Sequence, residues 1–160
     1  MYFTPGQLRS AAGIPPETYR HWKKALAPLC CQKGHSPCFS AGDLVAVAVV
    51  RVLVIDFGIR VGALGPLGEN LFALCNSAPW PTLERGWLMI DVPGTIIQFR
   101  PELGELQAGG PALLVPLRPI VARLRDQLLA ASEPEHQTTF RFPLTPLASA
   151  AKGANARTRP

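Results

Sequence analysis

The sequence predicts a mainly helical fold with a small amount of β-structure. Hydrophobic residues make up 48% of the chain and charged residues 17%, which is enough apolar material for a packed core and argues against a disordered chain. Seventeen prolines and fourteen glycines among 160 residues favour many short elements joined by stiff turns. Helix-capping patterns recur in the first half of the chain, and a hairpin pattern follows in the second half.

The N-terminal residues predict two short helices joined by a tight turn. Thr4 followed by Gln7 has the spacing of a capping box, so we expect a helix over residues 5–12. Gly13 suits the left-handed conformation that commonly ends a helix. A second helix is expected over residues 16–26. Two short helices with a short glycine-containing turn between them have the outline of a helix-turn-helix motif.

The middle of the chain predicts a loop followed by further helices. Residues 27–39 hold turn formers between short apolar pieces, which favours a tight β-loop. A second capping-box pattern starts at Ser40 and precedes an apolar run over residues 44–57. We interpret this run as a long helix, although its valine-rich composition would also suit a buried strand. Gly58 should end it, and a further helix interrupted by glycines is expected over residues 59–75.

The second half predicts a small sheet and a last helix. Two runs rich in strand formers, residues 86–92 and 95–100, flank a Pro-Gly pair and give a hairpin signal. Residues 112–115 fit a third strand. A helix should start near Pro119 and carry an apolar stripe. This stripe is the candidate dimerisation surface, although packing on the hairpin would explain it nearly as well. Its members are Leu117, Ile120, Val121, Leu124 and Leu128.

A proline-containing stretch over residues 76–81 marks an expected boundary. We predict a helix-turn-helix domain over residues 1–75 and a hairpin-and-helix region over residues 80–131. The second region would serve dimerisation or contact with a partner or effector. Residues 132–160 are polar and are expected to form a disordered tail.

Composition excludes several classes of protein. The most apolar run, residues 44–55, contains Arg51 and falls short of the roughly 18–20 residues needed to cross a bilayer, so no membrane span is expected. The first residues show no basic stretch followed by an apolar one, so we predict no signal peptide and a cytoplasmic location. Four cysteines are too few for a disulfide scaffold and should stay reduced in that compartment.

The basic residues are concentrated near the N-terminus. The net charge is +5, and residues 1–40 hold five Lys or Arg residues against Glu17 alone. Such a segment favours a polyanionic partner, most often nucleic acid. An ordinary solvated basic face is the alternative, and charge alone does not decide between the two.

Two stretches of the first half, residues 3–8 (FTPGQL) and 13–22 (GIPPETYRHW), resemble the winged helix-turn-helix domain of the MerR family. Residues 39–44 (FSAGDL) continue the resemblance after the expected loop, which would be the wing. The resemblance covers about residues 2–70 of the chain. Its most specific part is the spacing of Gly, Thr, Arg and Trp in the second stretch. It implies a winged helix-turn-helix fold and a role in transcription regulation.

The resemblance also implies that the second helix enters the major groove of duplex DNA, with Arg20 and His21 on the phosphate backbone. Contacts of this kind position a protein, while residues near the start of the recognition helix reach base edges. Thr18 and Tyr19 are therefore candidates for base or sugar contacts, and Trp22 is the candidate core residue. The full set of candidate DNA contacts is Thr4, Thr18, Tyr19, Arg20, His21, Lys23, Lys24 and Lys33.

The cysteines near the expected wing are candidate metal ligands. Cys30, Cys31, His35 and Cys38 offer the thiolates and imidazole that Zn²⁺ prefers. Adjacent cysteines rarely bind one metal, and structural sites usually space their ligands by two to four residues. We therefore predict no metal and no other cofactor, and interpret these cysteines as small apolar packing residues. A zinc or redox-sensing site is the alternative.

No oriented nucleophile and base, and no phosphate-binding loop, can be recognised in the sequence, so we predict that the protein is not an enzyme. We expect a duplex DNA-binding transcriptional regulator that acts near the nucleoid as a homodimer on two half-sites, with a possible protein partner through residues 80–131. The first alternative is an architectural or recombination-directing DNA-binding protein. The second is an adaptor whose helix-turn-helix binds a protein, which Pro37 favours because the family's wing usually carries arginine there.

Overall fold

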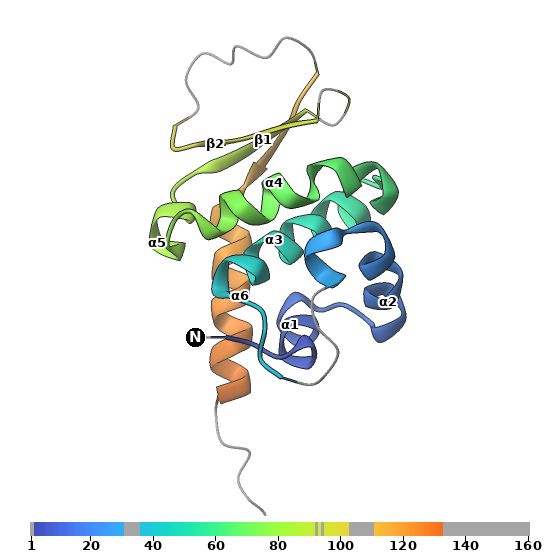
Figure 1. The fold of residues 1–160 in the computed structure, drawn as a ribbon. Helices are drawn as coiled ribbons and strands as arrows, with labels where there is room; N and C mark the ends of the chain where they lie inside the picture. Colours follow the sequence, from blue (N-terminus) through green and yellow to red (C-terminus); the bar gives the residue numbers. More distant parts are fainter. Residues whose placement is uncertain (1, 31–35, 92, 94, 103–110, 133–160) are drawn as a thin grey trace, which may run out of the picture.

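The computed structural model describes residues 2–30, 36–91, 93, 95–102 and 111–132. These residues form a mainly helical fold with a small three-stranded antiparallel sheet and a C-terminal helix (Figure 1). The expected combination of several helices with a little β-structure is confirmed at this level.

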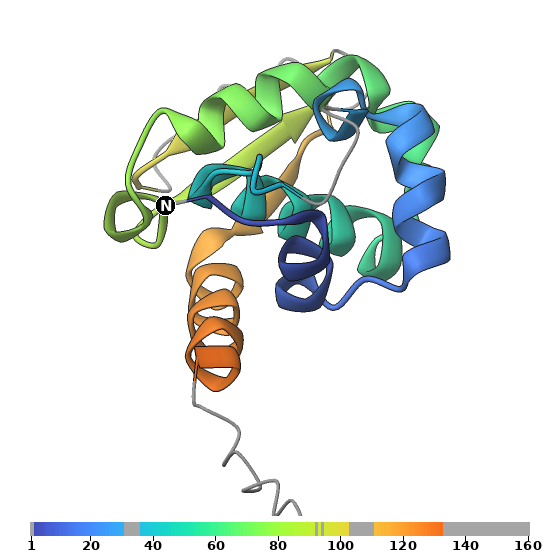
Figure 2. The ribbon, with the colours of Figure 1, turned by 60° about the horizontal axis from the view of Figure 1, so that its bottom comes forward.

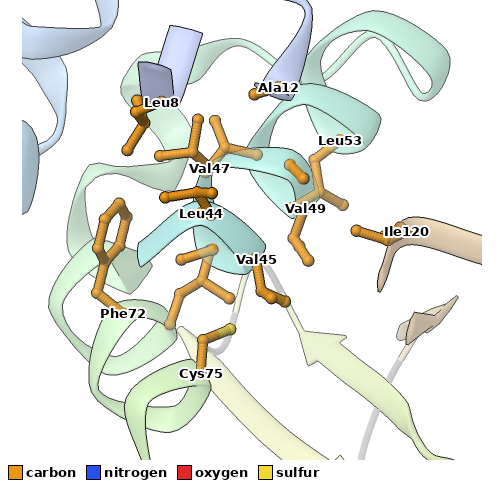
Figure 3. Close-up of a cluster of buried hydrophobic side chains, with 14 of the residues drawn as sticks. Leu8, Ala12, Leu44, Val45, Val47, Val49, Leu53, Phe72, Cys75 and Ile120 are labelled. Atoms are coloured by element: carbon orange, nitrogen blue, oxygen red, sulfur yellow. The ribbon is translucent and has the colours of Figure 1, made fainter. Parts of the chain in front are cut away.

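The helix α3 (Ala41–Arg51) lies at the centre of the molecule and contacts α4, α1 and α6. Its side chains over residues 44–50 are all buried, because a helix that is apolar on every face must be covered on every face. Figure 3 shows them surrounded by Leu8 of α1, Phe72 of α4 and Ile120 of α6. The helical interpretation of this apolar run is confirmed and the strand alternative is excluded.

Both ends of α3 are defined by local features. At its start, the Ser40 hydroxyl accepts a hydrogen bond from the amide of Asp43, and the Asp43 carboxylate accepts one from the amide of Ser40 at 2.8 Å. This is the expected capping box. At its end, the chain does not stop but continues as a π-helical turn, η2 (Val52–Asp56). The helical run therefore continues to Asp56, and Gly58, with φ +69°, follows its end as expected.

Two short helices precede α3, as expected. The helix α1 (Pro5–Ala12) begins at the capping box formed by Thr4 and Gln7, and its Leu8 is buried against α3. The helix α2 (Pro16–Ala25) follows after a short turn and packs against η1 and η3.

The described part of residues 27–39 does not form the expected β-loop. Ala27–Cys30 form a 3₁₀ turn, η1, and Phe39 forms an isolated antiparallel bridge with Phe3. Both Leu29 and Phe39 are buried, so these two side chains belong to the core. Residues 31–35 lie outside the described residues, and with them the wing contact expected of Lys33.

The segment expected to form one interrupted helix forms two elements. A 3₁₀ turn, η3 (Val61–Leu64), leads into α4 (Gly65–Asn76). After α4 comes a single helical turn, α5 (Trp80–Leu83), at the expected boundary. The indole of Trp80 donates a hydrogen bond to the Ala41 carbonyl at 3.0 Å, so this connection is held against the start of α3.

The sheet confirms the hairpin and the third strand. The central strand β1 (Trp87–Asp91) pairs antiparallel with β2 (Ile96–Arg100) and with β3 (Leu113–Pro116). Leu88 and Ile90 alternate along β1 and face the core. The helix α4 lies beside β2, as both ribbon views show (Figures 1 and 2).

The last helix, α6 (Leu117–Ser132), runs from the end of β3 along α3 and α1 (Figure 2). The stripe proposed for dimerisation is used inside the chain. Leu117, Ile120, Val121 and Leu124 are buried in its core, and Leu128 is partly buried against it. The dimerisation assignment is therefore corrected: four of these five side chains are buried against the protein's own elements, and only Leu128 keeps some exposed surface.

One hydrophobic core joins the two halves of the chain. Leu8 of α1, Leu44 of α3, Leu88 of β1 and Val121 of α6 belong to the same buried cluster. The two regions that were expected to be separate, on either side of residues 75–80, therefore share this core. In the described part of the chain, no helix combines the length and apolarity needed to span a membrane. The disordered tail was expected over residues 132–160; Ser132 instead ends α6, and residues 133–160 lie outside the described residues.

Candidate nucleic-acid interface

The turn between α1 and α2 has a geometry that fixes the second helix relative to the first. Gly13 has φ +64°, the left-handed conformation that glycine adopts without strain. The amides of Gly13 and Ile14 donate to the carbonyls of Ser10 (3.1 Å) and Arg9 (2.9 Å), so the last turn of α1 is closed. Ile14 is buried, and Pro15 starts the next helix in an extended conformation.

The inner face of α2 is held by two aromatic side chains. Trp22 is only 1% exposed and Tyr19 only 7%, and their spacing of three residues puts them on the same side of the helix. The assignment of Trp22 to the core is confirmed. The assignment of Tyr19 to a base or sugar contact is wrong in this structure, because its ring packs in the core beside Trp22 instead of on the exposed face.

The outer face of α2 carries the charged residues. Arg20, His21 and Lys24 are exposed, and Thr18 and Lys23 are half-buried. One guanidinium nitrogen of Arg20 lies 2.8 and 2.9 Å from the two carboxylate oxygens of Glu17. These two side chains are 72% and 78% exposed, so water screens the pair and it stabilises the fold little. Arg20 is thus available to exchange Glu17 for another anion.

The two lysines at the end of α2 also have structural explanations. Lys23 and Lys24 lie in the last helical turn, where positive charge interacts favourably with the helix dipole. The ammonium of Lys23 lies 6.0 Å from the centroid of the Tyr19 ring, at the outer limit of a cation–π contact. Of the two, Lys24 therefore has the more freely exposed charge.

The two predicted threonine contacts differ in their surroundings. The Thr4 hydroxyl accepts a hydrogen bond from the Gln7 amide at 3.2 Å, so its role in the structure is to cap α1. Thr18 lies in the first turn of α2, a helix whose N-terminus has no side-chain cap. Uncapped amides at a helix N-terminus favour anions such as phosphate. Thr18 and these amides lie on the same end of α2.

Two basic residues from other helices lie near the turn between α1 and α2, and the sequence analysis did not identify them. A methyl group placed on Gly13 would lie 3.6 Å from Nη2 of Arg123 and 4.0 Å from Nε of Arg51. Arg51 ends α3 and Arg123 lies in α6. No local spacing connects these positions with the turn between α1 and α2, so only the packing of α1, α3 and α6 could have revealed them.

The candidate metal ligands are only partly described. Cys30 is exposed, and its thiol donates a hydrogen bond to the Lys23 carbonyl at 2.7 Å, while Cys38 packs partly buried against the core. Cys31 and His35 lie outside the described residues. Within the described ranges, no three His, Cys, Asp or Glu side chains are grouped so that they could hold a metal ion.

Comparison with known proteins adds no relative. No protein-family model, curated protein or solved structure matches the chain. The resemblance to the MerR family therefore depends on the quoted residues of the first half alone.

The cysteines are expected to differ sharply in their reactivity. Burial, together with a smaller effect of the nearby Asp43 carboxylate, raises the pKa of the Cys75 thiol to about 12. Because the thiolate is the reactive form, Cys75 should resist iodoacetamide in the folded protein at pH 8, whereas exposed Cys30 should be alkylated. Peptide mass spectrometry over a time course measures both rates, and unfolding in urea should make them similar. Equal rates in the folded state would contradict the burial of Cys75.

Proposed function

We propose that the protein binds duplex DNA through α2 and regulates transcription. The observation that carries the proposal is the two-sided character of this helix. Tyr19 and Trp22 anchor one side in the core, while Arg20, His21 and Lys24 are exposed on the other side. A recognition helix needs this arrangement, because it must be held firmly and still present its cations to the groove.

The chemistry of α2 supports two kinds of contact with DNA. Arg20 and Lys24 would neutralise backbone phosphates, which supplies most of the affinity and makes it depend on salt. Thr18 and the uncapped amides of the first turn lie at the end of the helix that would enter the groove first. Glu17 opposes binding, since its carboxylate occupies Arg20 and repels phosphate.

Two substitutions with opposite expected effects test the proposal. Arg20→Gln should weaken DNA binding roughly tenfold and lower the salt slope by about one unit, because one phosphate contact is lost. Glu17→Gln should strengthen binding, because it releases Arg20 and removes a repelling charge. Fluorescence anisotropy with a labelled duplex from the gene's own upstream region, across a salt series, measures both changes.

The controls separate sequence reading from general attraction. Random duplexes of the same length report non-specific affinity, and Arg118→Gln changes an exposed arginine on α6, away from α2. Equal affinities for Arg20→Gln and the unchanged protein would exclude α2 as the DNA-contacting helix. Absence of salt-dependent binding to any duplex would favour the adaptor, whose helix-turn-helix contacts a protein instead.

Binding as a homodimer to half-sites about one helical turn apart stays a prediction. The α6 stripe is not its surface, because four of its five side chains are buried in the chain's own core. An architectural or recombination-directing role uses the same contacts with DNA, and strong bending of the bound duplex without an effect on transcription would favour it.

A further inference from the structure

A pocket of about 300 Å³ lies between α1, the α3–η2 segment, the end of β3 and α6. Most of its lining is apolar and comes from small or branched side chains, among them Ala12, Ala48, Ile120 and Leu124. Phe57, which is half exposed, also lines it. This volume is at the small end of the range for small-molecule sites and has room for about ten water molecules.

Two arginines face this apolar pocket from different helices. Arg51 of α3 and Arg123 of α6 both line it, and their guanidinium groups converge near Gly13. Among the described residues, neither makes a hydrogen bond or an ion pair. The carboxylate of Asp56 also lines the pocket, but it forms no ion pair with either arginine. The lining thus carries one more positive charge than negative.

Arg123 is exposed to solvent, and Arg51 lies in the last turn of α3, where positive charge interacts favourably with the dipole of that helix. Positive charge near the end of α1 would suit the helix dipole. However, the carbonyls of Arg9 and Ser10 at that end already accept hydrogen bonds from the amides of Ile14 and Gly13. Two converging like charges repel each other, so an anion between them would be bound favourably.

The backbone beside the pocket belongs to the end of the α3–η2 segment. The π-helical turn η2 puts Val52 and Asp56 on the pocket wall and Phe57 directly after it. This turn ends the α3 segment, because Gly58 follows it with φ +69°, the left-handed conformation that commonly terminates a helix. Here the turn coincides with the pocket and with Arg51, the residue immediately before it.

We propose that this pocket binds a small apolar carboxylate. The carboxylate group lies between Arg51 and Arg123, and the hydrocarbon part lies against the walls from α1, α3 and α6. A nucleic-acid phosphate would require the arginines but not the apolar pocket, so the lining favours a small organic acid. The proposal does not depend on DNA binding, because it is tested in the absence of DNA.

Isothermal titration calorimetry of the full chain with phenylacetate tests the site. Saturable binding with a Kd on the order of 1 mM is expected for a ligand of this size. Acetate lacks the apolar part and phenylacetamide lacks the charge, so each should bind at least about tenfold more weakly. Arg51→Gln and Arg123→Gln should weaken phenylacetate by a similar factor, while Arg118→Gln on the same helix should not.

The possible outcomes separate the proposal from simpler explanations. A thermal melt of each variant checks folding, which should change little because neither arginine forms a hydrogen bond or an ion pair within the described residues. Equal binding of phenylacetate and phenylacetamide would overturn the role of the arginines. Inorganic phosphate binding as tightly as phenylacetate would reduce the site to a simple anion site. The proposal itself would be overturned if neither phenylacetate nor the longer hexanoate bound saturably at ligand concentrations up to about ten times the expected Kd.

Discussion

Replacing Gly42 with alanine is expected to destabilise the protein by about 2 kcal/mol. Gly42 lies in the first turn of α3, where this helix meets the end of α4. An added Cβ would lie 2.7 Å from the carbonyl oxygen of Cys75 and 2.6 Å from Cγ of Asn76. The carbonyl belongs to the backbone of α4, so the two helices themselves must move apart to relieve the clash.

The neighbouring hydrogen bonds increase this cost. The side-chain nitrogen Nδ2 of Asn76 donates to the carboxylate of Asp43 and to the Phe72 carbonyl, both at 2.8 Å, and the Ser40 hydroxyl donates to the side-chain oxygen of Asn76. Moving Asn76 would disturb this network at the cap of α3. Alanine also gains about 0.5–1 kcal/mol over glycine in a helix, but the clash and the lost hydrogen bonds exceed that gain.

Gly62→Ala is the matched control for Gly42→Ala. Apart from its own local backbone, nothing in the structure lies within 4 Å of the position where its Cβ would stand, and its φ is in the ordinary range. This substitution should leave stability unchanged or raise it by up to about 1 kcal/mol, since alanine restricts the unfolded chain more than glycine does. Urea denaturation followed by circular dichroism measures both variants. A Gly42→Ala protein as stable as Gly62→Ala would show that α3 and α4 can separate at little cost.

The sequence predicted best those elements whose signals are local. The capping boxes at Thr4 and Ser40 are hydrogen bonds between residues three apart, so their spacing can be read directly, and both are present. The hairpin was found for the same reason, because its turn chemistry lies between the paired strands. The valine-rich run of α3 was ambiguous, since a fully buried helix and a fully buried strand have the same apolar composition.

The features that could not be predicted from the sequence depend on packing between elements that are distant in the chain. An apolar stripe such as that of α6 is needed for a dimer and for a core alike, and only the position of α1 and α3 shows that it serves the core. Tyr19 and Trp22 are both aromatic and both suit a buried face, so choosing one of them for DNA contact was not justified by spacing. Arg51 and Arg123 are far apart in the chain and meet only in the folded protein.

Trp22→Ala is expected to be the most damaging single substitution, with a loss of about 3–5 kcal/mol in the free energy of unfolding. The side chain is 1% exposed and is among the largest that the core contains. Its removal leaves a cavity between α2 and the elements that α2 packs against, η1 and η3. Because small domains have only about 5–15 kcal/mol of stability in total, urea unfolding should shift to a much lower concentration.

The comparison of Trp22→Ala with Arg20→Gln separates the two faces of α2. Trp22→Ala should lower stability and also reduce DNA binding, because a recognition helix that is no longer anchored loses conformational entropy when it binds. Arg20→Gln should reduce DNA binding with almost no change in the urea midpoint, since its side chain is exposed and its ion pair with Glu17 is screened. Trp22→Phe should restore most of both properties. If Trp22→Ala kept full stability, α2 would not be held by its aromatic face, and the physical basis of the proposed DNA contact would be lost.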